Sequence, residues 1–141
     1  MEQRLSLVTL AARDLAAARA FYARLGWREA APSNSRIAFF DLGGFGLALF
    51  GRDDLAADAG VDGKGEGFRG VTLAHNVRTP AAVDATLADA VAAGGRLVKP
   101  AEATSWGGYS GYFTDLDGHL WEIAHNPFAR LDEAGGFHLE G

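Results

Sequence analysis

The sequence predicts an α+β fold built from two tandem modules, each with the order strand, helix, three strands. Two repeated segments support this prediction. VTLA at 8–11 recurs at 71–74, and FFDLGGFGLALF at 39–50 matches YFTDLDGHLWEI at 112–123. Both pairs hold equivalent places in the order of elements, which is typical of an internal repeat. We therefore divide a single domain into module 1 (about 5–50), a linker (about 51–69), module 2 (about 70–126) and a C-terminal tail (127–141).

The first module begins with LSLVTLA (residues 5–11), whose apolar and β-branched residues favour a strand. Asp14 then precedes apolar residues at helical spacing, so we expect it to cap a helix that ends at Gly26. Two further strands are predicted, RIAFFDL (36–42) and GLALF (46–50), and the module has three strands after the helix if WREAA (27–31) is counted as one.

The second module repeats this order. GVTLAHNV (70–77) is a predicted strand, and Thr79 followed by Pro80 is typical of a helix N-terminus. The helix ends at Gly94, and three strands follow, predicted as RLVKP (96–100), SGYFTDL (110–116) and HLWEIAH (119–125).

The linker between the modules is polar and rich in glycine, so we predict a flexible surface segment. Its GKGEGFRG stretch (63–70) resembles a phosphate loop only in composition, because it leads into a strand and not into a helix.

The composition of the chain argues against several classes of partner and site. The formal net charge is −5 and no basic stripe is present, so we expect no nucleic-acid partner. The absence of cysteine excludes disulfides, thiolate metal sites and a cysteine nucleophile. No apolar stretch has the length of a membrane span and the N-terminus lacks a secretion signal, so we expect a cytoplasmic protein without a membrane partner.

The duplicated module, FYARLGW in the first helix and GYFTDLDGHLWEI in the last two strands resemble the vicinal oxygen chelate superfamily over about residues 5–126. This superfamily includes glyoxalase I, extradiol dioxygenases and bleomycin-binding resistance proteins. The resemblance implies that the strands of both modules form an open half-barrel sheet around a cavity, with the helices on its outer face. It also implies a small organic ligand and a homodimer, while function must be read from the site itself.

Metal-using members of this superfamily take their ligands from an early residue of the first strand and a residue of the last strand in each module. When the repeated segments are aligned, Leu7 matches Gly70 and Leu49 matches Glu122 at these positions. A catalytic divalent ion usually needs about three protein ligands, and only Glu122 has a suitable side chain. We therefore predict that no metal is bound, and we predict no other cofactor.

Two histidines flank Glu122 in DLDGHLWEIAHNP, but strand geometry separates them from it. Side chains alternate between the two faces of a strand, so Glu122 shares a face with Leu120 and Ala124. His119, Trp121, Ile123 and His125 then point to the other face. For His75 and His138 we favour a surface or hydrogen-bonded role.

An ionised carboxylate facing an apolar cavity needs a hydrogen-bond donor, and Thr9, Thr72 or a tyrosine hydroxyl are the candidates for Glu122. Glu122 is then either a structural group, a general base or a receptor for a cationic ligand. The glycine-spaced segment TSWGGYSGYF adds aromatic side chains suited to a ligand site. The predicted ligand-binding residues are Thr9, Leu49, Thr72, Trp106, Tyr109, Tyr112 and Glu122.

Three functions stay open at this point. The favoured one is metal-free binding of a small organic molecule. The alternative is a lyase or dioxygenase-type enzyme, either with unrecognised metal ligands or with Glu122 as its catalytic base. A third role is protein interaction through the tail, whose Phe128, Leu131, Phe137 and Leu139 cover either a partner chain or their own domain.

Overall fold

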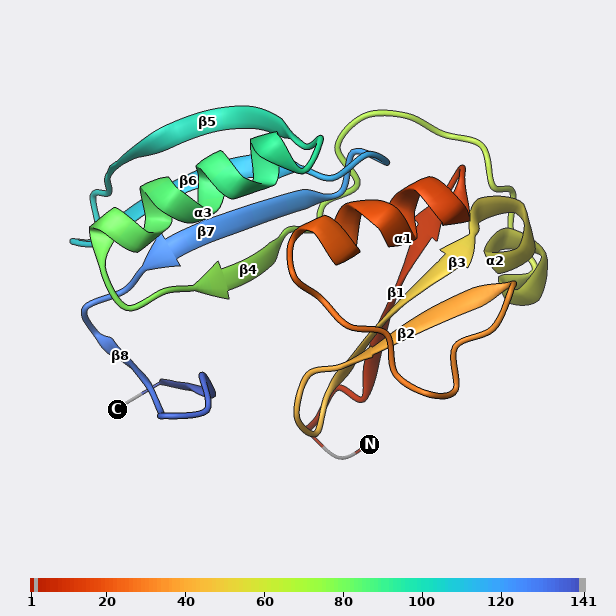
Figure 1. Cartoon of the computed structure of the whole chain (residues 1–141), viewed down its shortest axis with the longest axis horizontal. Coiled ribbons are helices and arrows are strands. Elements are labelled where there is room, and N and C mark those ends of the chain that lie inside the picture. Colours follow the sequence, from red (N-terminus) through yellow and green to blue (C-terminus); the bar gives the residue numbers. More distant parts are fainter. Residues whose placement is uncertain (2, 140–141) are drawn as a thin grey trace. The chain divides into compact units, whose positions relative to one another are not determined.

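The computed structural model describes residues 1 and 3–139 and divides into two compact units, Met1–Arg69 and Gly70–Gly141. Each unit is described by itself (Figure 1). Among the described residues, no helix is both long enough and apolar enough to cross a membrane.

Unit 1 contains a three-stranded sheet with the order β1-β3-β2. Its elements are β1 (Leu7–Ala12), α1 (Leu15–Arg24), β2 (Ile37–Asp41), β3 (Gly46–Gly51) and α2 (Arg52–Ala59). The first strand pairs in parallel with β3, and β2 pairs with β3 antiparallel. The side chain of Tyr22 on α1 packs against Phe40 of β2, with ring centroids 5.8 Å apart, so one face of this sheet is covered by α1.

Unit 2 contains a four-stranded sheet with the order β4-β7-β6-β5 and a C-terminal hairpin. Its elements are β4 (Leu73–Asn76), α3 (Pro80–Ala92), β5 (Arg96–Ala103), β6 (Tyr109–Thr114), β7 (Leu120–His125), β8 (Ala129–Leu131) and β9 (Phe137–Leu139). Figure 1 shows α3 lying along one face of this sheet, where it contacts β5, β6 and β7.

These units confirm the predicted α+β class with open sheets. The predicted helix caps are also confirmed, because Asp14 accepts a hydrogen bond from the backbone N–H of Ala17 (2.9 Å) and Thr79 accepts one from Ala82 (3.1 Å). Unit 2 has the predicted order of strand, helix and three strands. The half-barrel formed by both modules stays a prediction.

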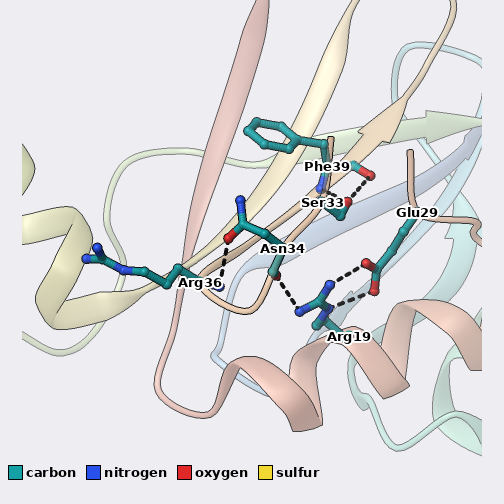
Figure 2. Close-up of polar contacts among 6 residues, drawn as sticks. All are labelled: Arg19, Glu29, Ser33, Asn34, Arg36 and Phe39. Atoms are coloured by element: carbon teal, nitrogen blue, oxygen red, sulfur yellow. Dashed lines mark hydrogen bonds and ion pairs between the residues drawn. The ribbon is translucent and has the colours of Figure 1, made fainter. Parts of the chain in front are cut away.

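The strand predicted at residues 27–31 is wrong. The segment makes one backbone hydrogen bond to β2, from the N–H of Ala30 to the Phe39 carbonyl (2.7 Å). This single bond is not extended into a ladder of strand hydrogen bonds. The Ser33 hydroxyl accepts from the Phe39 N–H (2.9 Å) and so replaces a strand partner. Figure 2 shows the segment anchored by Arg19 of α1, which binds both carboxylate oxygens of Glu29 (2.8 and 2.5 Å) and the Asn34 carbonyl (2.8 Å).

The linker prediction is also wrong in part, because α2 occupies the start of the segment. Asp53 and Asp54 lie in the first turn, where carboxylates interact favourably with the helix dipole, and Gly60 ends the helix in a left-handed conformation (φ 69°). The loop that follows is held to α2, since Arg52 donates to the carbonyl oxygens of Gly63 (2.6 Å) and Gly65 (3.0 Å).

The strand registers and helix caps correct the predicted alignment of the two modules. The equivalent caps are Asp14 and Thr79, and counting back from them matches Leu7 with Thr72 and not with Gly70. The repeated VTLA therefore does not mark equivalent positions. The cross-strand pair Phe40 and Leu47 in unit 1 corresponds to Phe113 and Trp121 in unit 2, so the second hairpin is one residue longer. A one-residue insertion moves a strand residue to the opposite face of its sheet.

The ion pair in Figure 2 gives a pH-dependent prediction. The hydrogen bonds from Arg19 hold the pKa of Glu29 below its usual value, so the stabilisation is present above about pH 4.5 and is lost as the pH falls through the lower folded-state pKa. We expect Glu29→Gln to lower the free energy of unfolding by about 0.5–1 kcal/mol at pH 7 and by much less at pH 3, measured by urea denaturation. The control is Glu66→Gln, which removes an exposed carboxylate of the same unit. An equal loss at both pH values would contradict this assignment.

Candidate functional site

The two faces of the unit 2 sheet differ in what covers them. On the first face, Phe113 stacks on Trp121 with ring centroids 6.3 Å apart, and a Cβ atom at Gly111 would come within 2.7 Å of Leu87 on α3. Because Gly111 pairs with Ile123, Trp121 and Ile123 lie on this helix-covered face. We call the opposite face of the sheet the open face.

The open face carries Tyr112, Glu122 and Ala124, in agreement with the alternation predicted along this strand. Ala74 pairs with Glu122 and Asn76 pairs with Ala124, which places both β4 residues on the same face. Two irregularities in β5 put Lys99 opposite Tyr112 and Glu102 opposite Ser110, so these two charged residues also belong to the open face.

A cavity of about 750 Å³ lies against this open face. Ala74, Asn76, Glu122 and Ala124 form its floor, and Trp106 from the loop between β5 and β6 forms one wall. The tail forms another wall through Leu131, Gly135 and Phe137. Every residue that lines the cavity belongs to unit 2.

Glu122 is half-buried and receives a hydrogen bond from the Tyr112 hydroxyl, its cross-strand neighbour. This contact agrees with the prediction that a tyrosine hydroxyl is the donor for Glu122. Burial and the adjacent carboxylate raise the pKa of Tyr112, so the phenol stays protonated and serves as the donor. The Lys99 ammonium lies nearby but forms its ion pair with Glu102 (2.7 Å).

Trp106 is 44% exposed and its indole lies against Gly108. A Cβ atom at Gly108 would overlap the indole ring, so a residue without a side chain is needed there. The Thr104 hydroxyl accepts a hydrogen bond from the Gly108 N–H (2.9 Å), and the Thr104 carbonyl accepts one from Gly107 (3.1 Å). These contacts fix the turn that holds Trp106 beside the cavity.

The tail wall is attached to the sheet by Arg78, which follows β4. Its guanidinium donates hydrogen bonds to the carbonyl oxygens of Leu131 (3.0 Å) and Asp132 (2.6 Å). Within the tail, Asp132 binds the His138 imidazole (2.8 Å), a contact that lowers the pKa of the carboxyl. Leu131 and Phe137 of the tail line the cavity of their own unit, and Phe137, Phe128 and Leu139 are 45%, 67% and 80% exposed.

The structure brings together three of the predicted ligand-binding residues, Trp106, Tyr112 and Glu122. Tyr109 lies on the helix-covered face, where its hydroxyl donates to Asp84 on α3 (3.0 Å) and this bond raises its pKa. Thr72 lies just before β4, and Thr9 is on β1 of the other unit.

The prediction that Leu49 is equivalent to Glu122 and lines a cavity is wrong. Leu49 is 1% exposed and lies on the face of its sheet that Phe40 and α1 share, because it pairs with Ala38, two residues from Phe40. The longer hairpin of unit 2 shifts the alignment by one residue, so Ala48 corresponds to Glu122.

Several cavity residues were missed by sequence analysis, among them Asn76, Arg78, Leu131 and Phe137. Asn76 could have been found from the alternation of side chains along the strand at residues 70–77. This requires the two modules to be aligned by their helix caps and not by the repeated VTLA. For the tail residues no sequence pattern indicated which surface they cover.

The ligand positions of metal-using relatives do not fit a metal in this chain. With the corrected alignment these positions are Leu7, Ala48, Thr72 and Glu122, which supply one carboxylate and one hydroxyl. Within residues 1 and 3–139, no group of three or more histidine, cysteine, aspartate or glutamate side chains is placed to hold a metal ion. His125 lies on the helix-covered face, with its Nδ1 3.3 Å from the Val77 carbonyl oxygen.

The family assignment follows from a comparison of the whole sequence. A model of the Glyoxalase/Bleomycin resistance protein/Dioxygenase superfamily matches residues 4–123. The chain belongs to this superfamily. This confirms the resemblance carried by the repeated module and by DLDGHLWEI. No curated protein matches the chain.

Solved structures of the superfamily share this fold. A glyoxalase-related enzyme from Fulvimarina pelagi is 37% identical, with a TM-score of 0.90 over 99% of this chain and 100% of that one. A glyoxalase/bleomycin resistance protein/dioxygenase family enzyme from Burkholderia phytofirmans PsJN is 25% identical, with a TM-score of 0.75 over 85% and 96% of the two chains. A lactoylglutathione lyase from Agrobacterium tumefaciens is 23% identical, with a TM-score of 0.65 over 89% and 96%, and shows the fold alone.

The role of Arg78 in holding the tail gives a second prediction. Arg78→Ala removes two charge-assisted hydrogen bonds to backbone carbonyls. We expect amides of residues 129–139 to exchange hydrogen at least about tenfold faster, with little change in β6 and β7, because the sheet does not depend on this contact. Hydrogen exchange read by mass spectrometry measures this, with the exposed Arg96→Ala as control. Unchanged exchange in the tail would show that other contacts hold it.

Proposed function

We propose that this superfamily member binds a small organic molecule, without a resident metal, in the cavity on the open face of unit 2. The size of the cavity supports this, since about 750 Å³ falls within the range of small-molecule sites. Its lining has the usual composition of such sites, with apolar walls and a few polar groups that orient a ligand.

The observation that carries the proposal is the pairing of a fixed carboxylate with an aromatic wall. Glu122 is oriented by the Tyr112 hydroxyl at the floor of the cavity, and Trp106 is positioned beside the same space by Gly108. Both side chains are held in place before a ligand binds, which reduces the conformational entropy that these side chains lose on binding.

A fragment screen by ¹H–¹⁵N NMR tests this function. We expect bound fragments to shift the amide signals of Ala74, Asn76, Glu122 and Ala124, with Trp106→Ala weakening binding about three- to tenfold through loss of an aromatic contact. Phe68→Ala, an exposed aromatic residue of unit 1, is the matched control and should leave affinities unchanged. A screen without fragments that shift the cavity signals would contradict the proposed function.

The second candidate function is catalysis by Glu122 as a general base. It is favoured by the 37% identical relative, described as a glyoxalase-related enzyme, and by the position of Glu122 at the floor of the cavity. The same screen in D₂O separates the two functions. Protein-dependent exchange of an acidic C–H in a bound carbonyl fragment, lost in Glu122→Gln, would indicate catalysis, whereas binding without exchange would support the first proposal.

A further inference from the structure

We propose that the ligand of this cavity carries a cationic nitrogen, such as an ammonium or amidinium group, on a flat aromatic body. Glu122 receives the cation and Trp106 receives the body. This inference rests on the proposed binding function and adds the chemical class of the ligand.

Glu122 forms no ion pair within the part of the chain that the structure describes, and the Lys99 ammonium interacts with it only at longer range. No lysine, arginine or histidine nitrogen of residues 1 and 3–139 lies within 4.0 Å of its carboxylate, and its donor, the Tyr112 phenol, is neutral. A half-buried carboxylate is stabilised by a cation more strongly than by neutral donors alone. A ligand cation at the floor of the cavity completes this interaction.

Two cationic side chains near the open face, Lys99 and Arg78, are bound to other groups. The Lys99 ammonium pairs with Glu102 at 2.7 Å, and the Arg78 guanidinium donates to the carbonyl oxygens of Leu131 and Asp132. Because Arg78 lines the cavity near the tail, its positive charge repels a ligand cation there. The ligand is therefore oriented with its cation at Glu122 and its apolar part toward the tail.

The shape of the cavity favours a flat apolar body. Its floor carries the small side chains of Ala74 and Ala124, and the indole of Trp106 forms a wall with one side against Gly108. Leu131 and Phe137 supply further apolar surface. An aromatic ring in this space gains contact area with Trp106, and a cation close to the indole face gains additional attraction.

Three matched probes test the inference: 1-naphthylmethylammonium, 1-naphthylmethanol and 1-naphthoate, which share an aromatic body and differ in charge. We expect NMR titration at low salt to give an affinity for the ammonium at least about tenfold higher than for the alcohol, and the weakest binding for the carboxylate. Added NaCl should lower the affinity for the ammonium probe and not that for the alcohol, because salt screens the interaction between charges.

In Glu122→Gln, the affinity for the ammonium probe should exceed that for the alcohol by less than about twofold, and the affinity for the alcohol should stay unchanged. Asp89→Asn, which removes an exposed carboxylate of α3, should leave the ratio of ammonium to alcohol affinity unchanged. The comparison of the three probes in the unaltered protein stands even if Glu122→Gln does not fold, which its melting curve would reveal.

The possible failures are distinguishable. Equal affinity for ammonium and alcohol, or preference for the carboxylate, would overturn the cationic class while the binding function stands. If some fragments shift the cavity signals but none of the three naphthyl probes binds, the proposed ligand class is likewise overturned while the binding function stands. If no fragment shifts those signals, the proposed function fails together with the inference.

Discussion

The packing of α3 against one face of the unit 2 sheet is the constraint on which the site depends. Burial of Phe113, Trp121 and Ile123 on the helix-covered face fixes the register of β6 and β7, because a one-residue slip would expose these side chains and bury the charged Glu122. With the register fixed, Tyr112 and Glu122 must lie side by side on the opposite face. The polar pair at the floor of the cavity is therefore a consequence of how the apolar residues pack.

The other walls of the cavity enclose the carboxylate of Glu122, which the sheet alone does not do. A strand pair that carries a carboxylate on an open face would leave it in water, where its interactions are weak. Trp106 and the tail partly enclose this face, and both are fixed by short polar contacts, to Thr104 in the first case and to Arg78 in the second. Enclosure strengthens the interaction between Glu122 and a charged ligand group without requiring an additional charged residue.

Sequence analysis predicted the elements that depend on local patterns. The caps at Asp14 and Thr79, the alternation around Glu122 and the α+β class follow from residue types and spacing, and the structure confirms them. It was wrong where the outcome depends on register or on tertiary contacts. Leu49 was assigned to the wrong face because one hairpin is a residue longer, and the strand at 27–31 is replaced by contacts from Arg19 and Ser33. The tail contains no periodic signal, so its contribution to the cavity was visible only in the structure.

A crystal structure of the protein grown with 1-naphthylmethylammonium tests the central claim most directly. The account predicts ligand density in the unit 2 cavity, with the nitrogen within about 3 Å of the Glu122 carboxylate and the naphthyl ring against Trp106. Density for the ligand on the helix-covered face, or in the cavity with its nitrogen turned away from Glu122, would contradict the account.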